Sequence, residues 1–192
     1  MKIRIRNKDT LVVVDVQKDF CPGGALEVPQ GDEIIPILNK YIEIFASHAA
    51  PIVVTRDWHP ENHSSFKDYG GVWPRHCVRD TEGAAFHAGL NLPKDTIVVS
   101  KATEPEKDAY SGFDGTNLEK ALKGQGITRI FVGGLATDYC VKATVLDALR
   151  LGFCTFVLLD AIKGVNIVAD DSERAIIDML EKGAIGITFQ DL

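Results

Sequence analysis

Three polar residues stand at the ends of apolar runs, and their chemical types suit nucleophilic catalysis. Asp15 follows the run LVVV, Lys101 follows TIVVS, and Cys140 closes the segment IFVGGLATDYC. Because ligands of open parallel sheets bind outside the carboxyl ends of the strands, one site could gather these side chains. A thiol beside a lysine and a carboxylate can act as an activated nucleophile. Taken singly, Asp15 is explained equally well as a turn or capping residue, and Lys101 as a solvated strand end.

The position of Cys140 at a predicted helix start adds a local argument. If Thr137 is the N-cap, Cys140 is the third helical residue, where unpaired backbone N–H groups and the helix dipole stabilise a thiolate. The local sequence leaves open the alternative of a small side chain buried against the sheet. The remaining cysteines suit packing or loop positions; they are Cys21, Cys77 and Cys154.

A second group of residues has the types and spacing of a metal site. Asp57 and His59 are two apart in TRDWHP, and Pro60 biases His59 toward an extended backbone, so both side chains project to one side. His76 in WPRHC could join them, and His63 in ENHSSF offers a further ligand. One carboxylate with two or three imidazoles suits a divalent first-row metal with open positions. The alternative is a set of loop histidines that make ordinary hydrogen bonds.

Aromatic residues lie beside these polar positions in the sequence. Phe20, Trp73 and Tyr110 could sandwich a planar ring. Core packing is the alternative for each of them alone.

The apolar patterns predict the elements that must position these residues. Continuous apolar runs predict strands at 11–14, 52–55, 97–99, 130–133, 153–159 and 184–188. Helical spacing predicts helices at 34–45, 118–122, 137–150 and 171–181. Their alternation predicts a three-layer α/β/α fold with a doubly wound, mainly parallel sheet of Rossmann-like type, as a single domain over 1–192. Residues 56–95 show neither period, and a connection of that length is typical of a functional loop.

Composition excludes several other classes of protein. The chain has 192 residues and a formal net charge of −6, which disfavours nucleic acid as a partner. Basic residues between 2 and 8 alternate with Ile3 and Ile5, which indicates an edge strand or an arm. The apolar runs fall far short of the ~18 residues that a membrane helix needs, and no secretory signal opens the chain. Four scattered cysteines without a CxxC spacing suggest free thiols. We expect a soluble, cytoplasmic protein.

Five segments follow one another along nearly the whole chain: VVVDVQKDFCPGGAL, TRDWHPENHSSF, WPRHCV followed by GAAFH, SKATEPEKDAYSGFDGT, and GLATDYCVKATVLDALRLGF. Together they resemble the nicotinamidase (pyrazinamidase) branch of the isochorismatase-like cysteine hydrolases. The DVQKDF motif marks only the superfamily, whereas its combination with the Asp-x-His segment is specific to this branch. The resemblance implies the isochorismatase-like hydrolase fold with a metal-binding loop at about 56–95.

The resemblance also implies roles for matching positions. The catalytic triad would be Asp15, Lys101 and Cys140. The metal ligands would be Asp57, His59 and His76, with His63 at a position that also ligates in some members. The oxyanion hole would be formed by the backbone N–H groups of Ala136 and Cys140, with a cis peptide bond between Leu135 and Ala136. The substrate pocket would include Phe20, Trp73, Tyr110 and Leu135.

The implied reaction is the metal-dependent hydrolysis of nicotinamide to nicotinate and ammonia through a thioester, a step of NAD salvage. In this scheme the helix start and Lys101 lower the pKa of the Cys140 thiol, and Asp15 takes its proton. The cofactor would be one divalent transition metal ion, with zinc expected and iron or manganese also suited to these ligands. It would hold the ring nitrogen, directly or through water.

Three alternatives come from other readings of the same residues. A related cysteine amidohydrolase could act on another small amide. A nucleotide-binding module is disfavoured because no GxGxxG follows a strand and GxxxxGK[ST] is absent. An interaction protein would leave the polar strand ends unexplained. The sequence leaves open whether the chain forms a homo-oligomer.

Overall fold

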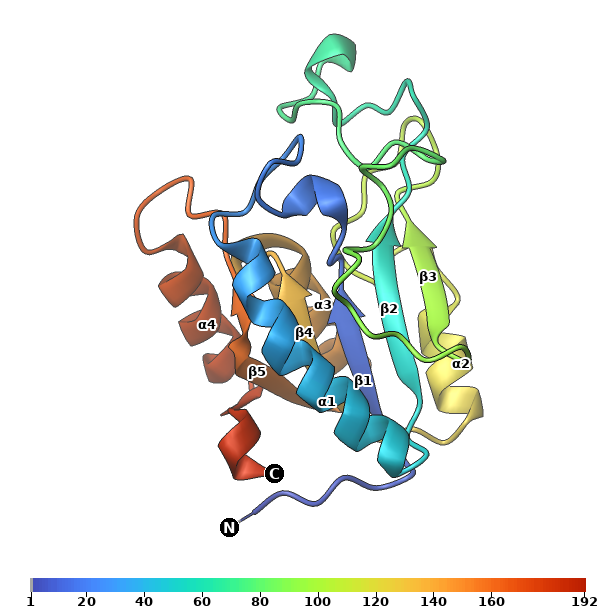
Figure 1. Ribbon diagram of the computed structural model, residues 1–192, viewed down its shortest axis with the longest axis vertical. Coiled ribbons are helices and arrows are strands. Elements are labelled where there is room, and N and C mark those ends of the chain that lie inside the picture. Colours follow the sequence, from blue (N-terminus) through green and yellow to red (C-terminus); the bar gives the residue numbers. More distant parts are fainter. Residues whose placement is uncertain (1) are drawn as a thin grey trace.

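The computed structural model describes residues 2–192, and within them six strands form one sheet in the order β3-β2-β1-β4-β5-β6. The strands are β1 (Asp9–Val14), β2 (Ile52–Asp57), β3 (Ile97–Lys101), β4 (Arg129–Leu135), β5 (Cys154–Lys163) and β6 (Ile185–Ile187). Each pair of neighbours runs parallel. All carboxyl ends therefore lie at one edge, the upper edge in Figure 1.

Helices cover both faces of the sheet, as the alternation of elements predicted. They are α1 (Ile35–Ser47), α2 (Leu118–Gly124), α3 (Lys142–Arg150) and α4 (Asp171–Glu181). Leu11 and Val13 of β1 belong to the core cluster shared with α1, whereas Val12 and Val14 belong to the cluster shared with the other three helices. Side chains of a strand alternate between faces, so β1 is buried on both sides and the fold is a three-layer α/β/α arrangement. The predicted fold class is confirmed.

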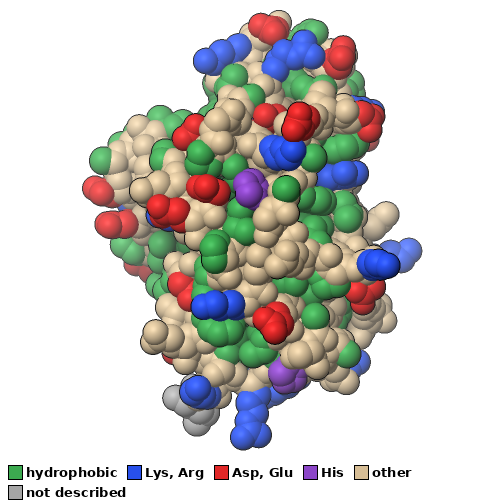
Figure 2. All heavy atoms as spheres, in the orientation of Figure 1, with side chains coloured by type: hydrophobic (Ala, Val, Ile, Leu, Met, Phe, Trp, Pro, Cys, Tyr) green, Lys and Arg blue, Asp and Glu red, His purple; other side chains and the backbone are tan. Residues whose placement is uncertain are grey.

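Two further features of residues 2–192 concern the kinds of partner considered above: the apolarity of the helices and the distribution of charge on the surface. No helix within residues 2–192 combines the length and the apolarity that crossing a bilayer requires. In the view of Figure 2, acidic and basic side chains are interspersed over the visible face rather than gathered into one basic patch.

The crossover from β2 to β3 contains no α-helix. Residues 58–96 form a long loop whose only helical turn is the 3₁₀ turn Lys67–Tyr69. The first half rises above the carboxyl edge of the sheet (Figure 1), and the second half returns along the face of α1. Ala84 and Leu90 of the returning half belong to the core cluster of that face. This half of the loop therefore supplies the apolar cover that a crossover helix would give.

The structure corrects two of the predicted boundaries. The loop was expected to begin at 56, but β2 continues to Asp57 because its last residues pair with Ser100 and Lys101 of β3. The strand predicted at 153–159 continues to Lys163, beyond an irregularity in its pairing with β4. Gly134 lies at this irregularity with φ of +124°, and a Cβ there would overlap the backbone of Val14. Only glycine allows β4 to approach β1 this closely.

The basic N-terminal segment is an arm and not an edge strand. Residues 2–6 contain no strand, although Ile3 donates a backbone hydrogen bond of 2.7 Å to Asp191. Arg129 at the start of β4 contacts the buried carboxylate of Asp9 and donates to the carbonyl oxygen of Arg4 at 2.7 Å. These bonds hold the arm at the edge opposite the carboxyl ends of the strands.

Candidate active site

The polar residues predicted at the strand ends meet at the carboxyl edge of the sheet. Asp15 follows β1 directly, Asp57 and Lys101 are the last residues of β2 and β3, and Cys140 lies in the turn after β4. Asp57 and Lys101 are partners in the strand register. The four side chains therefore come from four neighbouring strands, beneath the loop of residues 58–96 (Figure 1). This edge is where ligands of doubly wound sheets bind.

Lys101 stands at the centre of the group. Its fully buried Nζ lies 3.0 Å from Asp15 Oδ2 and 3.5 Å from Cys140 Sγ, and it also contacts Asp57 Oδ1. Burial alone would lower the pKa of Lys101, but the carboxylates of Asp15 and Asp57 raise it well above its ordinary value. The lysine is therefore a cation that balances two buried carboxylates.

Asp15 occupies an environment suited to a proton carrier. It is fully buried, has a left-handed backbone with φ of +48°, and accepts a hydrogen bond of 2.7 Å from Thr55 Oγ1. Burial raises the pKa of Asp15 above its ordinary value even though Lys101 and the Thr55 hydroxyl act to lower it. A carboxyl group whose pKa is raised accepts a proton more readily than an ordinary carboxylate and can return it in a later step.

Cys140 differs from the expectation in two respects. The cap of its helix is Ala136 and not Thr137, and Cys140 lies within a single π-helical turn, Thr137–Val141, that precedes α3. Burial raises the pKa of the Cys140 thiol well above its ordinary range, and the attraction of Lys101 does not offset this. The predicted lowering of this pKa is wrong, because the thiol is almost fully enclosed and faces two carboxylates. The thiol therefore needs a base at the moment of attack.

Asp57, His59 and His76 form a compact group of potential metal ligands. One ligand atom from each lies within 4.8 Å of the others, and all three side chains are buried. The Nε2 atoms of His59 and His76 lie 3.6 and 4.0 Å from Asp57 Oδ2. The two Nδ1 atoms contact backbone carbonyl oxygens, at Ala102 for His59 and at Pro74 for His76. Such contacts fix the tautomer in which Nε2 presents its lone pair.

Three observations show that this group fits a divalent cation. Within residues 2–192 no hydrogen-bond partner reaches the buried Nε2 of His59, a cost that a bound ion would remove. Burial lowers the pKa of His76 and keeps it in the neutral form that ligates metals. Burial acts to raise the pKa of Asp57, but the charge of Lys101 holds it below its ordinary value, so this carboxylate stays ionised.

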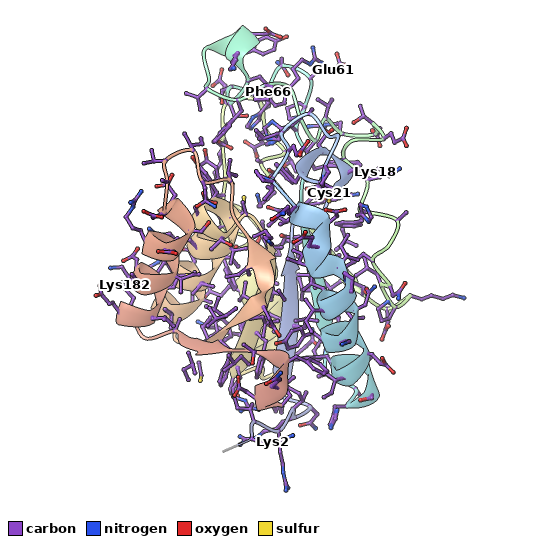
Figure 3. All side chains as sticks on the ribbon, turned by 60° about the vertical axis from the view of Figure 1, so that its left-hand side comes forward. Lys2, Lys18, Cys21, Glu61, Phe66 and Lys182 are labelled. Atoms are coloured by element: carbon purple, nitrogen blue, oxygen red, sulfur yellow. The ribbon has the colours of Figure 1, made fainter. Side chains whose placement is uncertain are left out.

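His63 lies next to this group but outside it. Its ring centroid is 4.2 Å from that of His59, while its Nδ1 contacts Ser65 Oγ at 2.7 Å and its Nε2 contacts the carbonyl oxygen of Lys107 at 3.2 Å. Both ring nitrogens are therefore engaged by the protein. Phe66, which Figure 3 labels in the loop above the sheet, is fully buried and packs edge-on against His59 and His63.

A cavity connects the thiol, the metal group and a set of aromatic side chains. Phe20, Trp73 and Tyr110 line it as predicted, together with Cys140, Ala136 and the three residues of the metal group. Trp73 Nε1 donates a hydrogen bond of 3.0 Å to the Tyr110 hydroxyl. The cavity is thus apolar on the side where a planar ring would pack and polar at the thiol and metal ends.

Leu135 is a correction among the predicted pocket residues. It is fully buried, belongs to the core cluster that includes α1, and is not among the residues that line the cavity. Leu135 is the last residue of β4, and alternation along the strand directs its side chain to the α1 face of the sheet. The expected cis peptide bond between Leu135 and Ala136 is present.

Several lining residues were missed by sequence reasoning. Tyr139 packs edge-on against Trp73 at 5.2 Å between ring centroids and lies 5.8 Å from Tyr110. Its place directly before Cys140 was the one signal that could have identified it. The other missed residues come from four further stretches of the chain; they are Leu26, Val28, Ser65, Asp108, Ala109 and Val165.

Comparison with known proteins identifies similar chains. The isochorismatase domain family matches residues 9–191. A nicotinamidase of Escherichia coli is 40% identical over 94% of this chain and 95% of its own length. The crystal structure of a pyrazinamidase of Pyrococcus horikoshii in complex with zinc has 54% identity and a TM-score of 0.91, covering 95% of this chain and 99% of that one. The structure of PnC1 from L. infantum in complex with nicotinate has 33% identity and a TM-score of 0.91, covering 100% and 98%.

Proposed function

The chain belongs to the isochorismatase domain family, and we propose that it is a nicotinamidase that hydrolyses nicotinamide to nicotinate and ammonia at Cys140. One observation carries the proposal: a buried thiol lies 3.5 Å from Lys101 Nζ, in a cavity lined by aromatic rings and by a potential metal group. The nicotinamidase of E. coli and the nicotinate complex of the L. infantum protein support the choice of substrate. Thioester chemistry at Cys140 belongs to this proposal.

The proposed reaction begins with the transfer of the thiol proton to Asp15. As Asp15 accepts this proton, Cys140 Sγ forms a bond to the carboxamide carbon, and the carbonyl oxygen becomes an oxyanion. The backbone N–H groups of Ala136 and Cys140, which both line the cavity, would donate to that oxygen. Donors of this kind contribute about 3 kcal/mol each in comparable sites. Asp15 then gives its proton to the departing nitrogen, so ammonia leaves and a thioester remains.

Hydrolysis of the thioester uses the same carboxylate. Asp15 takes a proton from water as the water oxygen attacks the thioester carbon, and it returns that proton to the Cys140 sulfur when the carbon–sulfur bond breaks. The thiol is restored, and the carboxylic acid product ionises to nicotinate when its remaining proton passes to ammonia or water. Lys101 stays charged throughout and stabilises the negative charge that develops on the Cys140 sulfur, 3.5 Å from its Nζ.

Asp57, His59 and His76 would hold one divalent metal ion, which we propose to be zinc. The carboxylate and imidazole donors suit zinc and also iron or manganese, and the similar pyrazinamidase of P. horikoshii was solved with zinc. When bound, the ion supplies a Lewis acid for the ring nitrogen of the substrate, directly or through water. Phe20, Trp73 and the other aromatic residues of the cavity would pack on the ring and place the carboxamide beside the thiol.

A substrate panel tests the proposed function. The purified protein should release ammonia from nicotinamide with kcat/KM at least about 100-fold above that for isobutyramide, because an aliphatic amide loses the aromatic packing and the ring nitrogen. Ammonia is measured by a coupled assay, with pyrazinamide as a second ring substrate. Equal or higher kcat/KM for isobutyramide would favour the related amidohydrolase of another small amide instead.

The substitution Thr55→Val is expected to shift the acid limb of the pH profile of kcat/KM. Thr55 Oγ1 donates to Asp15 Oδ1 at 2.7 Å, and this bond lowers the pKa of Asp15. In Thr55→Val the pKa of Asp15 rises, so the carboxylate stays protonated to higher pH and the rate falls at acidic pH. We expect the acid limb of kcat/KM to move upward by about one unit, because a bond to a charged group contributes about 1.5 kcal/mol or more.

Thr55→Ser is the matched control for this shift. It keeps the hydroxyl and should restore the acid limb to that of the unchanged protein. If the profile of Thr55→Val superimposes on that of Thr55→Ser, the acid limb does not report on Asp15.

A further inference from the structure

Asp138 belongs to the turn that carries the nucleophile, and its side chain holds a distant segment of the chain. Its Oδ1 accepts a hydrogen bond of 3.0 Å from the backbone N–H of Val165, and its Oδ2 accepts one of 2.8 Å from Asn166. Both bonds run from the turn after β4 to the segment between β5 and α4. Asp138 is not among the residues that line the cavity. No step of the proposed reaction uses its carboxylate.

The segment held in this way supplies part of the cavity wall. Val165 lines the cavity and packs against the core cluster of the α1 face. The residues that follow it are poorly packed, since Ile167 is 62% exposed and Val168 is 59% exposed. Apolar packing therefore does little to fix the segment beyond Val165, and polar contacts must do so.

The other end of the segment fits tightly against the start of α4. A Cβ at Gly164 would overlap Ser172 Oγ and would lie 3.0 Å from Asp138 Oδ1. Asn166 Oδ1 accepts a hydrogen bond of 2.9 Å from Ser172 N–H, and Asn166 itself has a left-handed backbone with φ of +53°. The segment 164–166 is thus held by the Asp138 carboxylate on one side and by the start of α4 on the other.

We propose, resting on the nicotinamidase function above, that Asp138 is a positioning residue for the substrate ring. Cys140 and Tyr139 enter the cavity from the same turn from which the Asp138 carboxylate reaches out to the 164–166 segment. The turn Thr137–Val141 therefore sets the position of the Cys140 sulfur. Through the Asp138 carboxylate it also sets the distance from that sulfur to Val165 in the wall of the cavity. Asp138 acts through this wall and touches no reacting atom, so it governs which ring fits and how tightly.

Kinetics of Asp138→Ala test this role. Both bonds to the 164–166 segment are lost, and we expect KM for nicotinamide to rise about tenfold while kcat stays within about twofold, because the wall contributes binding that is equal in ground and transition states. If Val165 is displaced, the cavity also accommodates a larger ring. The kcat/KM of a ring-methylated nicotinamide should therefore fall less than that of nicotinamide. Asp138→Asn keeps one acceptor oxygen, and its KM for nicotinamide should lie between those of Asp138→Ala and the unchanged protein.

Asp147→Ala is the matched control on α3. Asp147 forms an ion pair with Arg150 at 2.9 Å, and neither residue lines the cavity. Its removal should change neither KM nor the selectivity between the two rings. Thermal unfolding of each variant, followed by circular dichroism, checks that the proteins compared are folded.

Hydrogen exchange reports on the two hydrogen bonds accepted by Asp138 in the absence of any substrate. In Asp138→Ala the backbone N–H groups of Val165 and Asn166 should exchange faster than in Asp147→Ala, because their acceptors are gone. Unchanged exchange, or equal losses of kcat for both rings with KM constant, would overturn the proposed role. Failure of the nicotinamidase function would show separately, as absence of ammonia release from the unchanged protein.

Discussion

Cys140→Ala is expected to abolish ammonia release from nicotinamide, with kcat lowered at least about 10⁴-fold, because the only atom proposed to form a bond to the substrate is removed. The substitution deletes one sulfur from a buried position and leaves the ion pair between Lys101 and Asp15 in place. Metal content and the thermal unfolding midpoint should stay close to those of the unchanged protein. Steady-state ammonia assays and metal analysis of the same preparation measure both outcomes.

Cys154→Ala is the control for this prediction. Cys154 is an exposed thiol at the start of β5, at the far edge of the sheet from the cavity, and its loss should leave kcat unchanged. An acid quench during turnover adds a direct test, since the peptide that contains Cys140 should carry a nicotinoyl group by mass spectrometry. Turnover that persists in Cys140→Ala, or an acyl group on another cysteine, would refute the assignment of the nucleophile.

His59→Ala is expected to lower metal content and activity together. The substitution removes one of three ligands, and the affinity for the ion should fall by more than about 100-fold, since changes in the outer shell of metal sites alone cost 10- to 100-fold. His59 is a cleaner choice than Asp57, because Asp57 also contacts Lys101 and its removal would disturb the catalytic lysine. Elemental analysis after dialysis, paired with ammonia release, measures both quantities.

The control for the metal prediction is His48→Ala. His48 is exposed at the end of α1, where its ring contacts the carbonyl oxygen of Ile44 at 2.9 Å. This substitution should leave metal content and kcat unchanged. Full activity of the unchanged protein after chelation, with elemental analysis showing no divalent ion, would remove the metal from the proposed reaction.

The edge of the sheet that holds the site was predictable because the end of each strand is visible in the local sequence, where an apolar run gives way to a polar residue. Asp15 and Lys101 follow apolar runs, and the rule for parallel sheets brings such residues together without knowledge of the strand order. The pairing of Asp57 with Lys101 was not predictable in this way. It depends on β2 and β3 being neighbours, and the crossover between them has no helical period to reveal the topology.

The errors of prediction have a shared physical origin in burial and contacts across the chain. The pKa of Cys140 was expected to fall because its helix start and Lys101 are local features, whereas burial by other segments raises it. Leu135 was placed in the pocket by the resemblance alone, although alternation along β4 directs its side chain into the core on the α1 face. Val165 could not be found from the sequence, since the contacts that place it, such as the Asp138 carboxylate, come from residues far from it along the chain.

The missing crossover helix has an evolutionary consequence. The loop of residues 58–96 leaves the sheet after Asp57 and returns through β3, which ends at Lys101, the register partner of Asp57. Both ends are anchored by one pair of adjacent strands, so the loop can gain, lose or exchange residues at little entropic cost while Asp15, Lys101 and Cys140 keep their places. Descendants of one ancestor could therefore take up new amide substrates by rewriting this insertion alone, with the hydrolytic chemistry inherited intact.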